Sequence, residues 1–136
     1  MGLPGTTFLA LPGLLAGLVG CAGAGHSDPG AGSYAPIYQG GDVLRLDDTL
    51  VAFNVRMSGA RGEKDVEAYA RCMAAGYTME NNYGFARHVR TKIDEEGGVW
   101  RADAVYTISP SLPRGLRTID AEVTVADCAE RGIPTV

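Results

Sequence analysis

Three cysteines and two histidines are the residues of this sequence with the widest chemical range. Cys21, Cys72 and Cys128 stand far apart, so the chain has no Cys-x-x-Cys pair of the kind that redox enzymes use to lower a thiol pKa. His26 and His88 have neither a cysteine nor a second histidine at the spacing that a zinc site would require. The sequence therefore predicts no metal site and no bound cofactor.

Three consecutive carboxylates, Asp94 to Glu96, precede a Gly-Gly pair. A calcium site needs six or more arranged oxygen ligands, so a solvated hairpin turn is the simpler interpretation. No Gly-x-Ser-x-Gly elbow and no phosphate-binding glycine loop occurs. A small hydrolase would require a pocket around His88, Asp103 and Ser109. We expect a chain without catalytic activity.

A short basic segment is a candidate face for an anionic partner. In a strand, His88, Arg90 and Lys92 would share one face, opposite Val89 and Ile93. Such a face could bind a lipid head group or peptidoglycan, and the alternative is an ordinary solvated surface.

Charge is absent from the first part of the chain and begins at Asp28. All 12 Lys and Arg residues and all 16 Asp and Glu residues follow, with a formal net charge of −4. Nucleic-acid binding needs clustered positive charge, whereas the basic residues here are scattered among acidic ones. The composition therefore argues against a nucleic-acid partner, and 136 residues are enough for one small domain.

An apolar stretch, interrupted only by glycine and one proline, ends at Val19. It is shorter than the roughly 20 residues that a bilayer span needs, and it is typical of a secretory signal. Leu18, Val19, Gly20 and Cys21 resemble a bacterial lipobox, the cleavage site of lipoprotein signal peptides. The resemblance implies that residues 1–20 are removed and that Cys21 becomes the lipidated first residue.

The same resemblance implies a location. Two or more acyl chains anchor a protein stably to the lipid bilayer, and Ala22 stands where an aspartate would retain a lipoprotein at the inner membrane. We therefore expect the periplasmic face of the outer membrane. The alternative is cleavage after the small residues Ala22, Gly23 and Ala24, which would discard Cys21 and release a soluble secreted protein.

Residues 22–41 are rich in Gly, Ala, Ser and Pro and show no sustained periodicity. With the lipidated cysteine, residues 21–41 are expected to form a flexible tether. The folded periplasmic domain is expected to occupy residues 42–136, a size that folds alone around a modest core.

Apolar periodicity within this domain predicts one helix and four strands. The helix covers residues 63–82, with Gly62 as its N-cap and Asn82 where it must stop. Period-two alternation predicts strands over residues 51–57, 85–93, 100–108 and 119–125. The segment "DEEGG" is expected to form a hairpin loop of four or five residues between the second and third of these strands. At most, a short extra strand is expected near residues 43–46. The β-α-β-β-β order gives an α+β two-layer sandwich, with one helix on one face of an antiparallel or mixed sheet.

The region from the first strand through the helix resembles a group of small, mostly uncharacterised proteobacterial lipoproteins. Asn82 stands where that group has a glycine, and the matching positions are Gly59, Ala74, Ala75, Thr78, Tyr83 and Phe85. The resemblance implies close packing of the helix on the sheet, and it brings no known activity, catalytic residue or cofactor.

If Cys21 is lipidated, Cys72 and Cys128 remain as an even number in an oxidising compartment. They either form a disulfide or stay as two separate buried thiols. The function expected from the sequence is that of an envelope lipoprotein whose domain is structural or binds an envelope protein or peptidoglycan. The alternative is a small-ligand-binding domain that uses the open face of the sheet.

Overall fold

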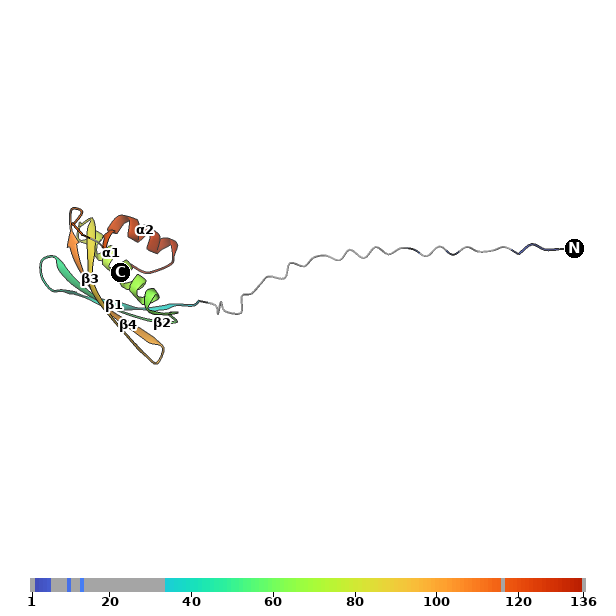
Figure 1. Cartoon of the computed structure of the whole chain (residues 1–136), viewed down its shortest axis with the longest axis horizontal. Coiled ribbons are helices and arrows are strands. Elements are labelled where there is room, and N and C mark those ends of the chain that lie inside the picture. The colour runs from blue at the N-terminus through green and yellow to red at the C-terminus, as the bar shows by residue number, and fades with distance from the viewer. Residues whose placement is uncertain (1, 6–9, 11–12, 14–33, 116, 136) are drawn as a thin grey trace. The chain divides into compact units, whose positions relative to one another are not determined.

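The computed structural model describes residues 2–5, 10, 13, 34–115 and 117–135. The chain divides into two units, Met1–Gly30 and Ala31–Val136, and the described helices and strands lie in the second (Figure 1). No helix among the described residues is long and apolar enough to cross a membrane. The elements in chain order are β1 (Ile37–Arg45), β2 (Leu50–Ser58), α1 (Glu63–Glu80), β3 (Phe85–Glu96), β4 (Val99–Ser109), β5 (Thr118–Asp120) and α2 (Ala121–Glu130).

The five strands form one antiparallel sheet in the order β1-β2-β4-β3-β5. Helix α1 packs on β2, β3 and β4, and α2 packs on α1 (Figure 1). This arrangement belongs to the predicted α+β class. The predicted β-α-β-β-β order is incomplete, because it allows at most a short strand where β1 lies and it lacks the helix α2 after β5.

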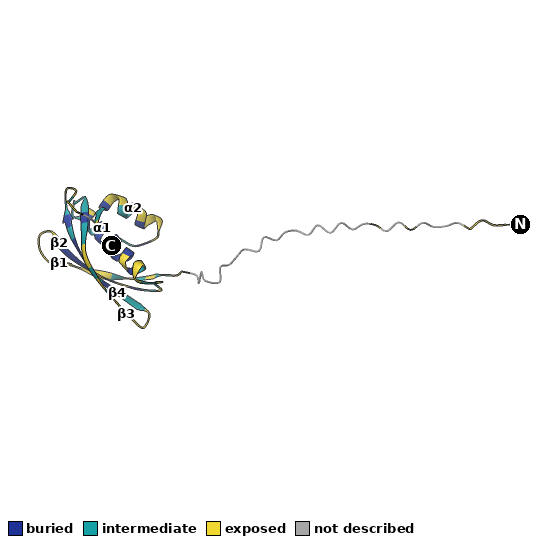
Figure 2. Cartoon of the chain, viewed as in Figure 1, coloured by how far each residue is buried: buried dark blue, intermediate teal, exposed yellow. Residues whose placement is uncertain are grey.

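The core lies between α1 and the sheet (Figure 2). Alternate residues of β2 and β4 are buried on one face, as their period-two patterns predict. Small residues of α1, Ala74 and Ala75, are fully buried and let the helix approach the strands closely. The larger core side chains from α1, β2 and β4 are Val66, Tyr69, Met73, Val51, Phe53, Val55, Met57, Tyr106 and Ile108.

Both ends of α1 follow from local chemistry, and the predicted helix is confirmed to within two residues at its end. In the first turn, Asp65 accepts hydrogen bonds from the backbone N–H of Arg61 at 2.7 Å and from its guanidinium at 2.9 Å. Beyond the last turn, Asn82 has a φ of 61°, the left-handed conformation that asparagine tolerates. The buried Thr78 hydroxyl donates to the Ala74 carbonyl at 2.7 Å, so it leaves no unsatisfied group.

The β3–β4 hairpin is tighter than the predicted loop of four or five residues. The strands pair as far as Glu96 and Val99, so only Gly97 and Gly98 connect them. Both glycines have positive φ, 60° and 82°, as a two-residue type I′ turn requires. Since Asp94–Glu96 belong to the strand, their side chains alternate between faces and do not converge as calcium ligands would.

The predicted strand over residues 119–125 is correct only for its first two residues, because β5 ends at Asp120 and the helix α2 follows. The Asp120 carboxylate accepts a hydrogen bond from the Val123 N–H at 3.2 Å, which caps the helix. Ala121 and Cys128, two turns apart, are fully buried on one helix face, whereas Val123 is 66% exposed. The apolar residues of this segment fit both periods, and the aspartate cap favours the helical one.

The first strand begins earlier than predicted. β1 starts at Ile37, inside the stretch 22–41 that was expected to be a tether, and extends well before residues 43–46. It pairs with β2 through a bulge, where Gly41 lies so close to the Asn54 carbonyl that any Cβ would overlap it. At the C-terminal end of the expected tether, the glycines that indicated flexibility therefore belong to a bulged edge strand.

Candidate functional site

A cleft of about 770 Å³ lies between α1 and the part of the sheet formed by β3, β4 and β5. Ligand pockets typically have volumes of roughly 300–1,000 Å³, so the cleft is large enough to be a candidate functional site. Its charged lining consists of four basic side chains and one carboxylate, from Lys64, Arg71, Arg117, Arg131 and Glu67.

The wall formed by α1 is one stripe of the helix. Lys64, Glu67 and Arg71 are three and four residues apart, so they lie on the same side of the helix, and all three are exposed. Ala68, between them, is buried and its small side chain leaves room above the sheet.

The opposite wall depends on a bulge in β3. The register shifts between His88 and Arg90, so that His88 pairs with Tyr106 and Arg90 pairs with Val105. The extra residue, Val89, moves every later side chain to the other face of the strand. His88 therefore faces α1 and the cleft, beside Thr91.

His88 and Tyr106 form the floor of the cleft. Their rings meet edge to face with centroids 5.2 Å apart, and the His88 Nε2 lies 2.6 Å from the Thr91 hydroxyl. Burial lowers the pKa of His88 below its ordinary 6.5, and the nearby Arg117 charge lowers it further, against an opposing effect of Glu67. Burial also raises the pKa of Tyr106 to about 12, so at neutral pH its hydroxyl keeps its proton and can donate.

Arg117 enters the cleft from the segment before β5. Its φ of 66° is left-handed, a conformation that costs a residue with a Cβ roughly 1–2 kcal/mol. The Arg117 carbonyl accepts a hydrogen bond from the His88 N–H at 3.0 Å, which holds the backbone there. In the next residue, Thr118, the hydroxyl oxygen is buried and has no hydrogen-bond partner among the described residues.

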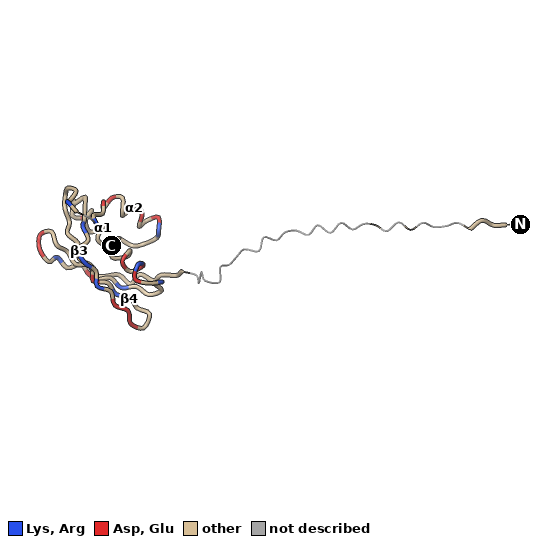
Figure 3. Tube along the Cα trace, in the orientation of Figure 1, with Lys and Arg blue, Asp and Glu red and all other residues tan. Residues whose placement is uncertain are grey.

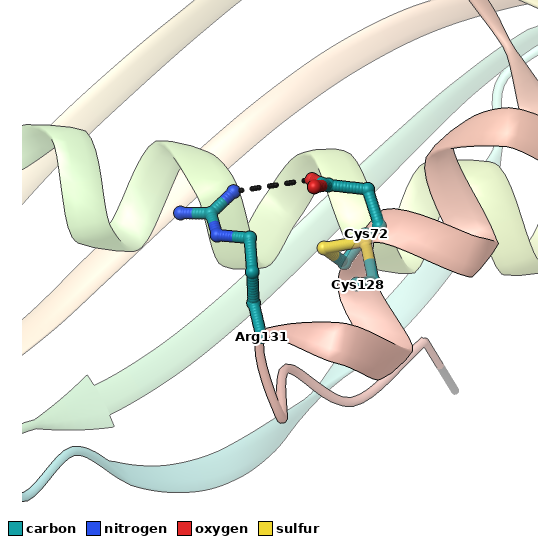
Figure 4. The surroundings of a disulfide bond; sticks show 4 residues. Cys72, Cys128 and Arg131 are labelled. Carbon is teal, nitrogen blue, oxygen red and sulfur yellow. Dashed lines mark hydrogen bonds and ion pairs between the residues drawn. A yellow bond between two sulfur atoms is a disulfide. The ribbon is translucent and has the colours of Figure 1, made fainter.

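Arg131 reaches the cleft from the end of α2, close to the disulfide that joins the two helices (Figure 4). The structure joins Cys72 of α1 and Cys128 of α2 in this bond, the first of the two alternatives left open by the sequence, with Cα atoms 5.9 Å apart. The Arg131 guanidinium lies 3.4 Å from the Asp127 carboxylate, and both side chains are about half exposed.

A second hollow, of about 490 Å³, lies beside β1, β2, β3 and β4 and differs from the cleft in the charge of its lining. Figure 3 marks the positions of the Lys and Arg residues in blue and of the Asp and Glu residues in red along the chain trace. The second hollow has equal numbers of basic and acidic side chains, from Arg56, Lys92, Arg101, Asp42, Asp94 and Asp103. The first has four basic residues against one acidic residue, so it is the stronger site for an anion.

The predicted basic face of His88, Arg90 and Lys92 is wrong as a shared face, because the bulge puts His88 on the other side of the sheet from the two cations. Arg90 is paired with Asp103 at 3.1 Å. The hydrolase residues are not brought together either: His88 lines the cleft, Asp103 lines the second hollow, and the Ser109 hydroxyl donates to the Ser111 carbonyl at 2.7 Å.

Four basic residues of the cleft were not singled out from the sequence. The spacing of Lys64 and Arg71 on a predicted helix was a readable signal, whereas Arg117 and Arg131 carry none, because only the tertiary fold brings them to α1. The lipobox Leu18–Cys21, His26 and the expected tether up to residue 33 lie outside the described residues.

A family model, the YNQ4 C-terminal domain, matches residues 38–132, a range that includes every lining residue of the cleft. The chain belongs to this family. The chain is also similar to a protein of Paracoccus denitrificans named "Uncharacterized 26.9 kDa protein in nqo8 5'region", with 31% identity over 103 residues. The match covers 71% of this chain and 40% of that protein, so the chain spans well under two thirds of its relative. No solved structure matches the chain significantly.

Proposed function

We propose that this protein is a lipid-anchored protein of the bacterial cell envelope whose YNQ4 C-terminal domain binds a small molecule in the basic cleft. The observation that carries the binding role is the convergence of polar and charged side chains from α1, β3, β4, the β5 segment and the end of α2 on one cleft of about 770 Å³. In this proposal the sheet and the helices act as a two-layer sandwich, and the ligand lies between the layers. This location replaces the open sheet face expected from the sequence.

Two features support the envelope location. Leu18–Cys21 resemble a lipobox, and Ala22 in place of aspartate favours the outer membrane. The Cys72–Cys128 bond suits the same location, because disulfides persist in oxidising compartments such as the periplasm.

A second candidate is the interaction role expected from the sequence, with an envelope protein or peptidoglycan as the partner. The edge strand β1 favours it, because exposed edge strands can pair with another chain. Ile37, Leu44 and Leu46, on or next to this strand, are each about half exposed or more.

Two experiments test the proposed function. The full chain, expressed in a Gram-negative host, should stay in the membrane pellet after carbonate washing, and Cys21→Ser should release it. The purified full chain should be stabilised in a thermal-shift screen of small metabolites, and the hits should shift amide NMR signals around Arg71 and His88. A screen without hits, or shifts confined to the second hollow, would contradict the assignment of the cleft.

A further inference from the structure

We infer that the ligand of the cleft is a small hydroxylated phosphomonoester, with its phosphate group held by Arg71, Arg117 and Arg131. This inference rests on the proposed function, because it names the chemical class of ligand for the same cleft.

The first step of the argument is uncompensated charge. Among the described residues, Lys64, Arg71 and Arg117 have no carboxylate within 4.0 Å, and Arg131 has only an exposed partner in Asp127. An exposed pair of this kind is worth at most about 1 kcal/mol, so a ligand can replace it. Charge of one sign gathered in a concave site concentrates the electric field and attracts a multiply charged anion.

The second step is the direction of the donors. Three arginines come from three separate segments: α1, the residue before β5 and the end of α2. A planar carboxylate is satisfied by the fork of one arginine, whereas a phosphate group presents three oxygens that can take donors from several walls. The left-handed backbone of Arg117 sets the direction in which its side chain leaves the main chain, and strained residues of this kind cluster at binding sites.

The third step is the volume of the cleft that a phosphate group leaves unfilled. A phosphate group fills only a small part of about 770 Å³, so the ligand carries an organic part. Glu67, the one carboxylate in the lining, would repel a second phosphate but can accept hydrogen bonds from hydroxyl groups, and the Tyr106 hydroxyl can donate one. A hydroxylated organic part therefore fits the remaining lining.

The experiment compares defined probes by calorimetry on the full chain, purified in an uncharged detergent. The probes are glycerol 3-phosphate, inorganic phosphate, glycerate, glycerol and, as the lipid source of phosphate, short-chain phosphatidylglycerol. Glycerol 3-phosphate should bind at least tenfold more tightly than each of the others. Arg71→Gln should weaken this binding about tenfold or more, as expected for a lost charged hydrogen bond. The matched control Arg101→Gln removes the same charge from the second hollow and should change binding less than twofold.

The outcomes separate the inference from the proposed function. Equal weakening by Arg71→Gln and Arg101→Gln, or tighter binding of phosphatidylglycerol or glycerate, would overturn the inference. If an uncharged metabolite from the screen binds in the cleft and no phosphate probe does, the inference fails while the proposed function stands. If no compound binds, both fail.

Discussion

Breaking the Cys72–Cys128 bond should lower the free energy of unfolding by about 4 kcal/mol. The two cysteines are 56 residues apart, and closing a loop of that length restricts the unfolded chain by about this amount in the chain-entropy model. Domains of this size have a total stability of roughly 5–15 kcal/mol, so the loss is a large fraction. For a domain of about 100 residues it corresponds to a fall in melting temperature on the order of 15–30 °C.

Loss of the disulfide should destabilise α2 first, because few other interactions attach this helix to the rest of the domain. Only Ala121 and Cys128 of α2 are buried. Without the bond, amide hydrogens of α2 should exchange much faster than those of the central strands β2 and β4, which the core covers.

Guanidinium unfolding of the oxidised and reduced full chain measures the effect. Both cysteines are almost fully buried, so the bond must be reduced in denaturant and the chain refolded in reductant. The Cys72→Ala/Cys128→Ala variant controls for other effects of the reductant. An unchanged unfolding midpoint after reduction would refute the reasoning, as would finding both residues as free thiols in the protein purified without reductant.

Two further predictions concern single positions. A Cβ at position 76 would overlap the Thr135 carbonyl, so Gly76→Ala should displace the C-terminal segment and expose Ile133. The net loss of unfolding free energy should be about 1 kcal/mol, once the higher helix propensity of alanine is subtracted from the cost of exposing Ile133. Chemical denaturation measures the loss. Gly84→Ala, where a Cβ meets only the Pro110 carbonyl at an ordinary 3.7 Å, is the control, and equal losses in both variants would contradict the prediction. Because the pKa of His88 is lowered in the folded state, the unfolded state takes up a proton first as pH falls below about 6.5, and stability decreases. The unfolding midpoint should therefore fall less between about pH 7 and pH 5 in His88→Gln than in the natural chain, and parallel pH curves would contradict this.

The sequence was sufficient where one periodicity had no competitor. The alternation over residues 51–57 and the helical stripe over residues 63–82 each place apolar side chains on one face, and both elements are present in the structure. The same reasoning failed where a second pattern fitted equally well. Residues 119–125 fit both periods, and the decisive feature was the carboxylate of Asp120, a single polar residue at the helix start.

The site was harder to predict than the fold, because one inserted residue decided it. Strand residues alternate with a period of two, so the bulge at Val89 reverses the face of everything that follows. Without the bulge, His88 would lie on the same face as Arg90. With it, the imidazole lies beside Tyr106 in the cleft, and no composition or spacing signal in a single sequence marks this change.

The disulfide connects the stability of the domain to the geometry of its cleft. Arg71 directly precedes Cys72, and Arg131 lies about one helical turn after Cys128, so one bond fixes the relative positions of two arginines from different helices. Since α2 has few buried side chains of its own, the position of Arg131 depends on this bond more than on packing. Arg117 is held instead by the hydrogen bond from His88 and by its own backbone. The phosphate-binding geometry that we infer therefore needs the oxidised chain, which is the form that an oxidising envelope compartment maintains.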